Sequence, residues 1–129
     1  MKTNFSTINF HQIKLSIIIT NAEGMVLLIK EKVQKRDRPL WNTVKGTYDN
    51  YEEDILQTAI RECEEEASVK VRLTHILGVY FIREKLKIIL QLGFLAQIES
   101  GIPKAPKRNI QKKLGEDISE VKWFNKAEL

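Results

Sequence analysis

Apolar residues follow two different spacings along this chain. In most segments they form short runs rich in isoleucine, leucine and valine, which favour β-strands because branched side chains pack well on a pleated sheet. The first two runs are separated by residues 21–24, Asn-Ala-Glu-Gly, a combination typical of a hairpin turn. A second hairpin is predicted to turn at Glu84 and Lys85. The predicted strands are 12–20, 25–29, 69–73, 76–83, 86–98 and 120–124.

One segment has helical spacing instead. Apolar residues recur there every three or four positions, which predicts an amphipathic helix from about residue 51 to 67. Asn50 and, three positions later, Glu53 match a capping box, so we expect the helix to begin near Asn50. Its apolar stripe should pack against the protein core. The residues of this stripe are Leu56, Ala59, Ile60, Cys63 and Ala67.

Length and composition favour one domain. A chain of 129 residues with 43% hydrophobic and 29% charged residues is ordinary for a soluble globular protein and too short for two independent cores. We therefore treat residues 1–129 as one domain. Between residues 99 and 116 the composition shifts to Gly, Pro, Lys and Asn, which predicts a long surface loop.

The apolar stretches and the cysteine count restrict the protein further. No apolar stretch is long enough to span a bilayer, and the N-terminal residues lack the apolar region of a secretory signal, so a cytoplasmic location is expected. Cys63 is the only cysteine, which excludes an intrachain disulfide and a cysteine-based metal cluster. Any metal ion must be bound through oxygen or by the two histidines.

Positive charge gathers in two segments of a chain whose formal net charge is +4. Either cluster would attract a phosphate-rich ligand, although solvated loop charge is an equally good interpretation. An RNA-binding surface is a weaker alternative, because the interleaved aromatic residues of a base-stacking platform are missing. The first basic cluster is Lys30, Lys32, Lys35, Arg36 and Arg38, and the second is Lys104, Lys107, Arg108, Lys112 and Lys113.

Three carboxylates converge on the predicted helix. At about 100° per residue, Glu62 and Glu66 lie one turn apart on the same face and Glu65 flanks them. The glutamates alone are more typical of a solvated acidic face. A glycine upstream, Gly46, changes this interpretation because it lets the backbone approach the carboxylates. A helix with an apolar back and a carboxylate front is suited to bind a hard divalent ion such as Mg²⁺, which prefers oxygen ligands.

The segment from Gly46 to Val69 resembles the Nudix box, which is a Gly, five residues, a Glu, seven residues, and then Arg-Glu-apolar-x-Glu-Glu-x-Gly-apolar. Gly46 fits the leading Gly and Glu53 the next Glu, and seven residues separate Glu53 from Arg61. The order of elements is similar to the family as well, with a hairpin and a Trp before the box and strands after it. The remaining matches are Glu62, Cys63, Glu65, Glu66 and Val69.

The segment departs from the family pattern in two ways. The loop between Gly46 and Glu53 is one residue longer, and Ser68 stands where the family has Gly, at a helix end that favours a left-handed conformation. These departures keep an alternative open, namely a Nudix-like domain with weak or no turnover that binds a nucleotide or a protein partner.

The resemblance implies both a fold and an activity. The fold is α/β, a mixed β-sheet sandwiched between α-helices. Similar enzymes hydrolyse the pyrophosphate bond of a nucleoside diphosphate joined to another group, using Mg²⁺ or Mn²⁺. The expected substrate is a nucleoside triphosphate, a dinucleoside polyphosphate or a nucleotide sugar. Neither a membrane nor a nucleic acid is an expected partner, and a homodimer stays open.

The resemblance also assigns roles around the metal. It implies that Glu62 and Glu66 are metal ligands, and that Glu65 is a third ligand or helps to deprotonate the attacking water. Arg61 would orient a carboxylate, with Glu53 as the candidate, through a charge-assisted hydrogen bond.

Further groups are predicted outside these glutamates. The Gly46 region would offer a backbone carbonyl to the ion, and Glu116 is preferred to Asp117 and Glu99 as a carboxylate from a later loop. On the substrate side, Lys45 could contact a phosphate as a point charge, although a solvated lysine is equally expected. Trp41 could stack on a nucleobase, but core packing is its more frequent role. Arg38, from the first basic cluster, is the third candidate for substrate binding.

Overall fold

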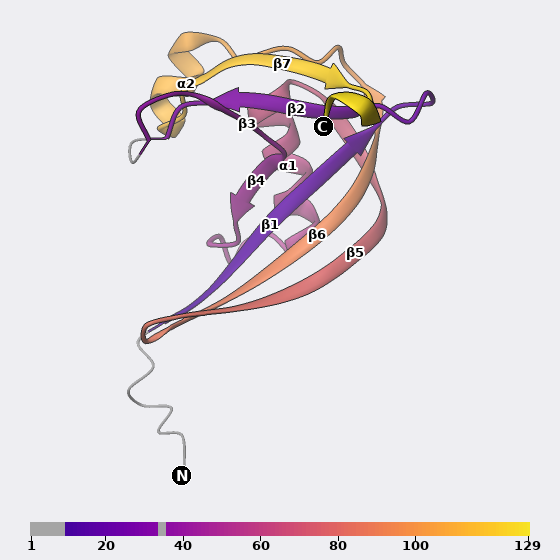
Figure 1. Cartoon of the computed structure of the whole chain (residues 1–129). Coiled ribbons are helices and arrows are strands. Elements are labelled where there is room, and N and C mark those ends of the chain that lie inside the picture. The colour runs from indigo at the N-terminus through magenta and orange to yellow at the C-terminus, as the bar shows by residue number, and fades with distance from the viewer. Residues whose placement is uncertain (1–9, 34–35) are drawn as a thin grey trace.

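The computed structural model describes residues 10–33 and 36–129, so Lys35 of the first basic cluster and the N-terminal segment 1–9 lie outside the described residues. A mixed sheet and two α-helices form a single domain (Figure 1), which confirms the predicted α/β fold class. The strands are β1 (Phe10–Thr20), β2 (Val26–Glu31), β3 (Leu40–Asn42), β4 (Val44–Thr47), β5 (Lys70–Glu84), β6 (Lys87–Ser100) and β7 (Ile118–Phe124). The helices are α1 (Ile55–Ala67) and α2 (Arg108–Leu114), and a 3₁₀ turn follows at Lys126–Glu128.

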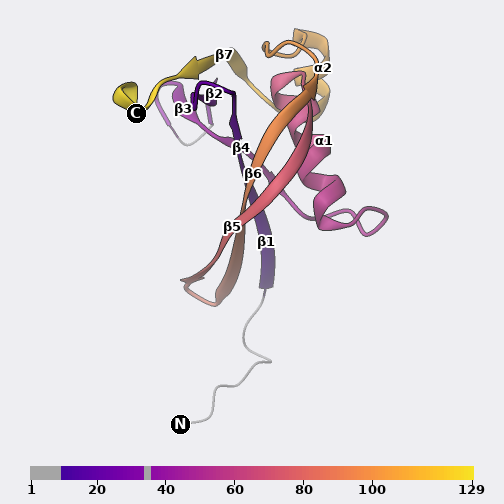
Figure 2. The same cartoon turned by 90° about the vertical axis from the view of Figure 1, so that its right-hand side faces the viewer.

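Strand β1 organises the sheet, whose order is β3-β2-β1-β6-β5. It runs parallel to β6 along its whole length, and its other edge pairs antiparallel with β4 and, at its end, with β2. Strand β7 pairs antiparallel with β2. In Figures 1 and 2, β2, β3 and β7 lie together at one end of the molecule, while β1, β5 and β6 sweep away from them past α1.

Helix α1 packs against β4 and β5 through the apolar side that its spacing predicts. Ala59, Cys63 and Ala67 are fully buried there. Leu56 is the exception, because it is 50% exposed. Its predicted place on the stripe was wrong, and the partly buried Ile55 packs on the core instead.

The helix also begins later than predicted. Asp54 caps it, with a carboxylate oxygen that accepts from the Gln57 N–H at 2.8 Å while the Gln57 side chain accepts from the Asp54 N–H at 2.8 Å. This capping box replaces the one expected from Asn50 and Glu53. Asn50 instead closes a turn, in which its carbonyl accepts from the Glu53 N–H at 3.2 Å. The Glu53 side chain is engaged elsewhere, as described below.

Two further predictions are corrected by the structure. The segments 69–73 and 76–83 belong to one strand, β5, in which register shifts near Leu73 and Ile76 interrupt the alternation of apolar and polar residues. The predicted loop 99–116 contains α2, which is too short for a clear helical period and has no side-chain cap at Lys107. Both hairpins are confirmed, although β1 and β2 share only two residue pairs.

Strands β5 and β6 extend well beyond α1. We call their outer part, residues 76–90, the distal hairpin. Figures 1 and 2 show it projecting from the body of the molecule beside the beginning of β1. In the part of the chain that the structure describes, no helix is long and apolar enough to cross a membrane.

Candidate metal centre and catalytic site

A group of three carboxylates lies at the buried edge of α1. Glu62 and Glu66 come from successive turns of the helix, and Glu116 comes from the segment between α2 and β7. Each offers a carboxylate oxygen, and these oxygens all lie within 4.8 Å of one another. The structure thus brings together Glu62 and Glu66 of the Nudix-like motif and Glu116, the later carboxylate that the sequence analysis preferred.

Glu116 is held in place by a buried glutamine of α2. The side-chain amide of Gln111 donates to the carbonyls of Pro106 and Ile118 at 2.7 and 2.9 Å, and its oxygen accepts from the Ile118 N–H at 2.6 Å. The Gln111 carbonyl also accepts from the Glu116 N–H at 2.9 Å. Because Gln111 is buried, these bonds fix α2 to the start of β7 and direct Glu116 toward α1.

The environment of this carboxylate group disfavours its negative charge. Burial and the neighbouring Glu62 raise the pKa of Glu66, which is 3% exposed, and burial likewise raises the pKa of Glu62. Burial and the charges of the other glutamates raise the pKa of Glu116 to about 7. Oε2 of Glu116 is buried and has no hydrogen-bond partner among the described residues. An orphaned oxygen among buried carboxylates fits a divalent cation, which would neutralise the charge and accept this ligand.

A fourth carboxylate was missed by the sequence analysis. Glu31 lies at the end of β2, and its charge is among those that raise the pKa values of Glu66 and Glu116. Burial and then Asp117 raise the pKa of Glu31 itself. The signal was present in the sequence, because Leu27, Ile29 and Glu31 alternate along a strand and therefore point to the same face.

Gly46 allows the backbone of β4 to approach the carboxylates. A Cβ atom at this position would lie 2.5 Å from Cγ of Glu62, a separation that real Cβ atoms do not adopt. The preceding N–H, of Lys45, donates to Oε1 of Glu66 at 3.5 Å. The β4 backbone therefore lies close to the glutamates, as expected, and it can do so because Gly46 has no side chain.

Arg61 links three of the predicted site residues. Its Nε donates to both oxygens of Glu53 at 3.0 Å, and one terminal nitrogen contacts Glu65 at 2.9 Å. A weaker contact of 3.5 Å reaches Glu62. The Arg61 guanidinium lowers the pKa of Glu53 below its ordinary range. The expected ion pair between Arg61 and Glu53 is present, while Glu65 pairs with Arg61 and lies outside the tight group of three carboxylates.

The longer loop before Glu53 is accommodated without displacing this network. The Tyr48 hydroxyl donates to the Glu53 carbonyl at 2.8 Å, and the Tyr48 N–H donates to Ile13 at 2.8 Å. The Thr58 hydroxyl adds a bond of 3.0 Å to Oε1 of Glu53. At the other end of the motif, Ser68 adopts the left-handed conformation (φ 62°) that the family pattern gives to Gly. Both departures therefore keep the geometry of the helix and its partners.

Two hollows border the site. A cleft of about 370 Å³ is lined by Lys14, Lys45, Gly46, Ile82 and Gln91 among others, so Gly46 borders both this cleft and Glu62.

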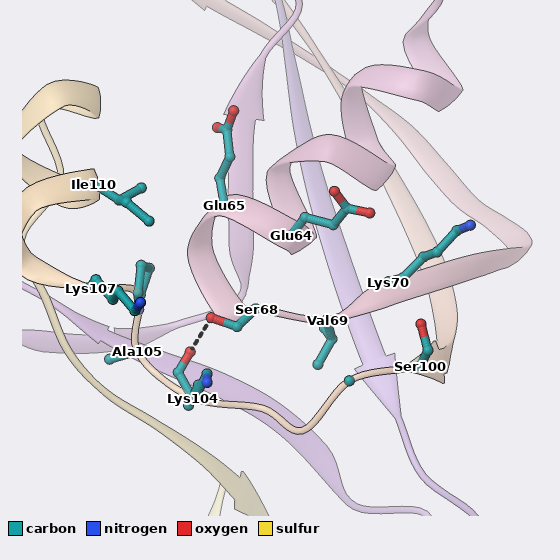
Figure 3. Close-up of a pocket in the computed structure, with 12 residues that line it drawn as sticks. Glu64, Glu65, Ser68, Val69, Lys70, Ser100, Lys104, Ala105, Lys107 and Ile110 are labelled. Carbon is teal, nitrogen blue, oxygen red and sulfur yellow. Dashed lines mark hydrogen bonds between the residues drawn. The ribbon is translucent and has the colours of Figure 1, made fainter.

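A larger cavity, about 580 Å³, lies between the end of α1 and the segment that leads into α2 (Figure 3). There the Ser68 hydroxyl donates to the Lys104 carbonyl at 3.0 Å. Glu65 lines this cavity together with Lys104 and Lys107, which places part of the second basic cluster beside the acidic helix.

The other predicted substrate contacts are less closely associated with the carboxylates. The Trp41 ring packs edge-on against Phe124, with ring centroids 4.8 Å apart, and Lys30 lies over it. Trp41 is opposite Lys30 in the sheet, hence on the face of β2 that does not carry Glu31. Arg38 is exposed between β2 and β3. The structure does not bring either residue into the group formed by Glu62, Glu66 and Glu116.

Comparison with known proteins supports the geometric evidence. A family model described as the NUDIX domain matches residues 10–129. The chain belongs to the Nudix family of hydrolases. No curated protein matches it in sequence. Among solved structures it is similar to a Nudix hydrolase from Nitrosomonas europaea, with 23% identity and a TM-score of 0.70 over 92% of this chain and 59% of that one.

Two other solved structures extend the comparison. A MutT Nudix hydrolase from Burkholderia pseudomallei is 23% identical with a TM-score of 0.72, over 92% of this chain and 86% of that one. An ADP-ribose pyrophosphatase from Streptococcus suis is 14% identical with a TM-score of 0.66, over 92% and 76% of the two chains. At these identities the likeness shows a shared Nudix fold, and the substrates of those proteins are their own.

Proposed function

We propose that this Nudix protein is a pyrophosphohydrolase that requires Mg²⁺ or Mn²⁺ and cleaves a nucleoside diphosphate-linked substrate in the cytoplasm. The observation that carries the proposal is the group of Glu62, Glu66 and Glu116, whose oxygens lie within 4.8 Å of one another and include the orphaned Oε2 of Glu116. Buried carboxylates that repel one another destabilise the fold unless a cation or protons neutralise them, so their convergence is better explained by function than by stability.

The ligand set that we propose consists of Glu62, Glu66 and Glu116, with a backbone carbonyl near Gly46. Oxygen ligands of this kind suit Mg²⁺ and Mn²⁺. The bound ion would neutralise phosphate charge and lower the pKa of the attacking water. Glu31 is close enough to influence the same group, and we propose that it strengthens the negative potential at the ion.

Arg61 and its partners would act by positioning. Arg61 holds Glu65 at 2.9 Å, next to the metal ligands, in a place from which a carboxylate can accept a proton. We assign to Glu65 the removal of a proton from water as the water oxygen attacks phosphorus and the bond to the leaving phosphate breaks. Glu53 keeps the Arg61 guanidinium fixed from its other side, which limits the motion of Glu65.

The substrate would extend from the carboxylates into the cleft beside Gly46. Lys45 lines this cleft and is the residue that we propose contacts a phosphate. Lys104 and Lys107 would add positive potential from the larger cavity, which they line together with Glu65. Trp41 and Arg38 stay predictions for substrate binding, because no contact links them to the carboxylate group. Similar folds include an ADP-ribose pyrophosphatase and a UDP-X diphosphatase, so ADP-ribose and nucleotide sugars belong among the substrates to test.

The proposal is tested by turnover of a substrate panel with and without metal. Nucleoside triphosphates, dinucleoside polyphosphates, ADP-ribose, NADH and UDP-sugars are incubated with Mg²⁺, Mn²⁺ or a chelator, and phosphate-containing products are measured. Glu62→Gln should lower kcat by about 10²–10³-fold on the substrate that is cleaved, as expected when a group that stabilises the transition state is lost. Glu64→Gln is the matched control, because Glu64 is exposed on the same helix and should retain activity.

Failure has two distinct forms in this assay. Absence of turnover above the Glu62→Gln background for every substrate would refute the hydrolase. Saturable binding of one nucleotide without turnover would then favour the alternative of a nucleotide-binding Nudix domain.

A further inference from the structure

The distal hairpin carries apolar surface that the fold does not cover. From residue 76 to residue 82 of β5, every side chain except that of Gly78 is a large apolar one, and each is 39–68% exposed. These residues are Ile76, Leu77, Val79, Tyr80, Phe81 and Ile82. β5 is also the last strand in the sheet order, so its outer backbone edge has no neighbouring strand among the described residues. Natural proteins usually protect such edges with charges, prolines or short strands.

The pattern of exposure indicates how this surface would be covered. Neighbouring residues of a strand point to opposite faces, so the run from Val79 to Ile82 exposes apolar side chains on both faces of the sheet. Continuous apolar runs of this kind are typical of strands whose two faces are both covered. A partner packed on one face would leave the other face exposed, whereas an added strand at the edge contacts side chains on both faces.

The sequence of β5 is suited to pair with itself. From Gly78 to Glu84 the pairing with β6 is regular, which leaves an undistorted outer edge over the same residues. An antiparallel copy with its two-fold axis through Phe81 would place Phe81 opposite its own copy and Tyr80 opposite Ile82, so that each pair lies on one face of the sheet. Aromatic and branched cross-strand pairs stabilise antiparallel sheets, and no charged residue faces a like charge in this arrangement.

The available area matches a dimer of modest affinity. If a large side chain presents about 150–250 Å² when fully exposed, the six side chains together present on the order of 600 Å². Monomers rarely expose a contiguous apolar patch above about 600 Å², and a standard interface buries about 800 Å² on each partner. The strand backbone and the half-exposed Leu86 and Leu90 nearby add to the six side chains.

We infer that two copies of this chain associate through β5, pairing antiparallel across a two-fold axis through Phe81, so that the two sheets form one continuous sheet. This association goes beyond the proposed hydrolase activity and uses none of its catalytic residues. The Glu62→Gln variant should therefore dimerise like the wild type, which separates a failure of this inference from a failure of the proposed function.

Sedimentation velocity over protein concentrations from about 1 to 100 µM tests the association, since interfaces at the low end of the size range are typically weak. The wild type should shift from monomer to dimer. Phe81→Lys places two lysines opposite each other at the axis and should raise the dimer dissociation constant at least about 10-fold, because like charges then meet across the strands. Tyr51→Lys is the matched control, since Tyr51 is 95% exposed in the loop before α1 and should leave dimerisation unchanged.

Disulfide trapping tests the register. An oxidised mixture of Tyr80→Cys and Ile82→Cys chains should give a cross-linked heterodimer, because these positions face each other. Tyr80→Cys alone should not, since its two copies would lie two residues apart, about 7 Å along the strands, which is too far for a disulfide. The native Cys63 is fully buried and does not compete.

Three results would overturn the inference. They are a wild type that stays monomeric up to the highest concentration, a Phe81→Lys variant that dimerises like the wild type, and Tyr80→Cys chains that cross-link alone as readily as the mixture. If the wild type were monomeric and removal of residues 1–9 produced a dimer, that segment would be the occupant of the edge instead.

Discussion

Strand β5 has two halves that share a sequence character and differ in surroundings. Near its start, Val71 is 2% exposed under α1, whereas Val79 farther along is 60% exposed. Strand β6 shows the same contrast, because Phe94 belongs to the core while Leu90 is 37% exposed. Apolar sequence therefore does not decide burial here. For β5 the difference is packing against α1, which covers the start of the strand and itself carries Glu62 and Glu66.

The largest effect should come from truncating one phenylalanine in the core and comparing it with the same truncation in the distal hairpin. Phe94→Ala removes a core side chain that is 2% exposed and should lower the free energy of unfolding by about 3–5 kcal/mol. Phe81→Ala, in the distal hairpin, should cost less than about 1 kcal/mol in dilute protein. Urea denaturation of both variants measures the difference. Equal losses would mean that the distal hairpin is as well packed as the core.

A second comparison uses two glycines of the sheet. Gly46→Ala introduces a Cβ at 2.5 Å from Cγ of Glu62, so the glutamate must move. Affinity for Mn²⁺ and turnover should fall about 10–100-fold, as when the support of a metal ligand is lost. Gly93→Ala is the control, because its Cβ would meet the nearest atom at an ordinary 3.6 Å. Isothermal titration with Mn²⁺ gives the affinities, and an unaltered Gly46→Ala variant would contradict the steric role of Gly46.

The smallest effect concerns pH. The pKa of Glu116 is about 7 in the folded protein against an ordinary 4.5, and the pKa of Glu66 is also raised, so the metal-free folded state binds more protons than the unfolded state above pH 4.5. Stability should therefore decline as pH rises from about 4.5 through 7. After allowance for solvent screening we expect a loss of roughly 1 kcal/mol, or about 3–6 °C in Tm.

Thermal melts between pH 5 and 8 check this expectation. Addition of Mg²⁺ or Mn²⁺ should reduce the decline, because the ion stabilises the charged carboxylates, and Glu66→Gln should reduce it without metal. A metal-free protein whose Tm rises across this interval would show that other groups dominate.

The sequence predicted those features of the site that lie close together in the chain. Helical spacing placed Glu62 and Glu66 on one face, and the Nudix resemblance pointed to Arg61 and Glu53 as partners. The start of the helix was misplaced because Asn50 with Glu53 and Asp54 with Gln57 both match a capping box. Only the three-dimensional contact between Glu53 and Arg61 decides between them, since it withdraws the Glu53 side chain from capping.

Contacts between distant segments were harder to predict. Glu116 was preferred to Asp117 and Glu99 as the later carboxylate. What brings Glu116 to the site is α2 and the hydrogen bonds of Gln111, and the composition of a Pro- and Lys-rich segment does not predict these bonds. Leu56 fits the apolar spacing, but it is 50% exposed, so it lies on a side of α1 that the core does not cover. The projection of the distal hairpin was likewise not predictable, because strand patterns do not reveal how far α1 reaches.

The anchoring of Glu116 through Gln111 has a consequence for the order in which the protein assembles. Glu62 and Glu66 are neighbours on one helix, whereas Glu116 follows Glu66 by 50 residues and arrives only when α2 and β7 have docked. Long-range contacts form late in folding because closing a long loop costs entropy. Full metal affinity should thus appear at the last step, and a bound ion should protect the C-terminal segment from proteases by holding it closed.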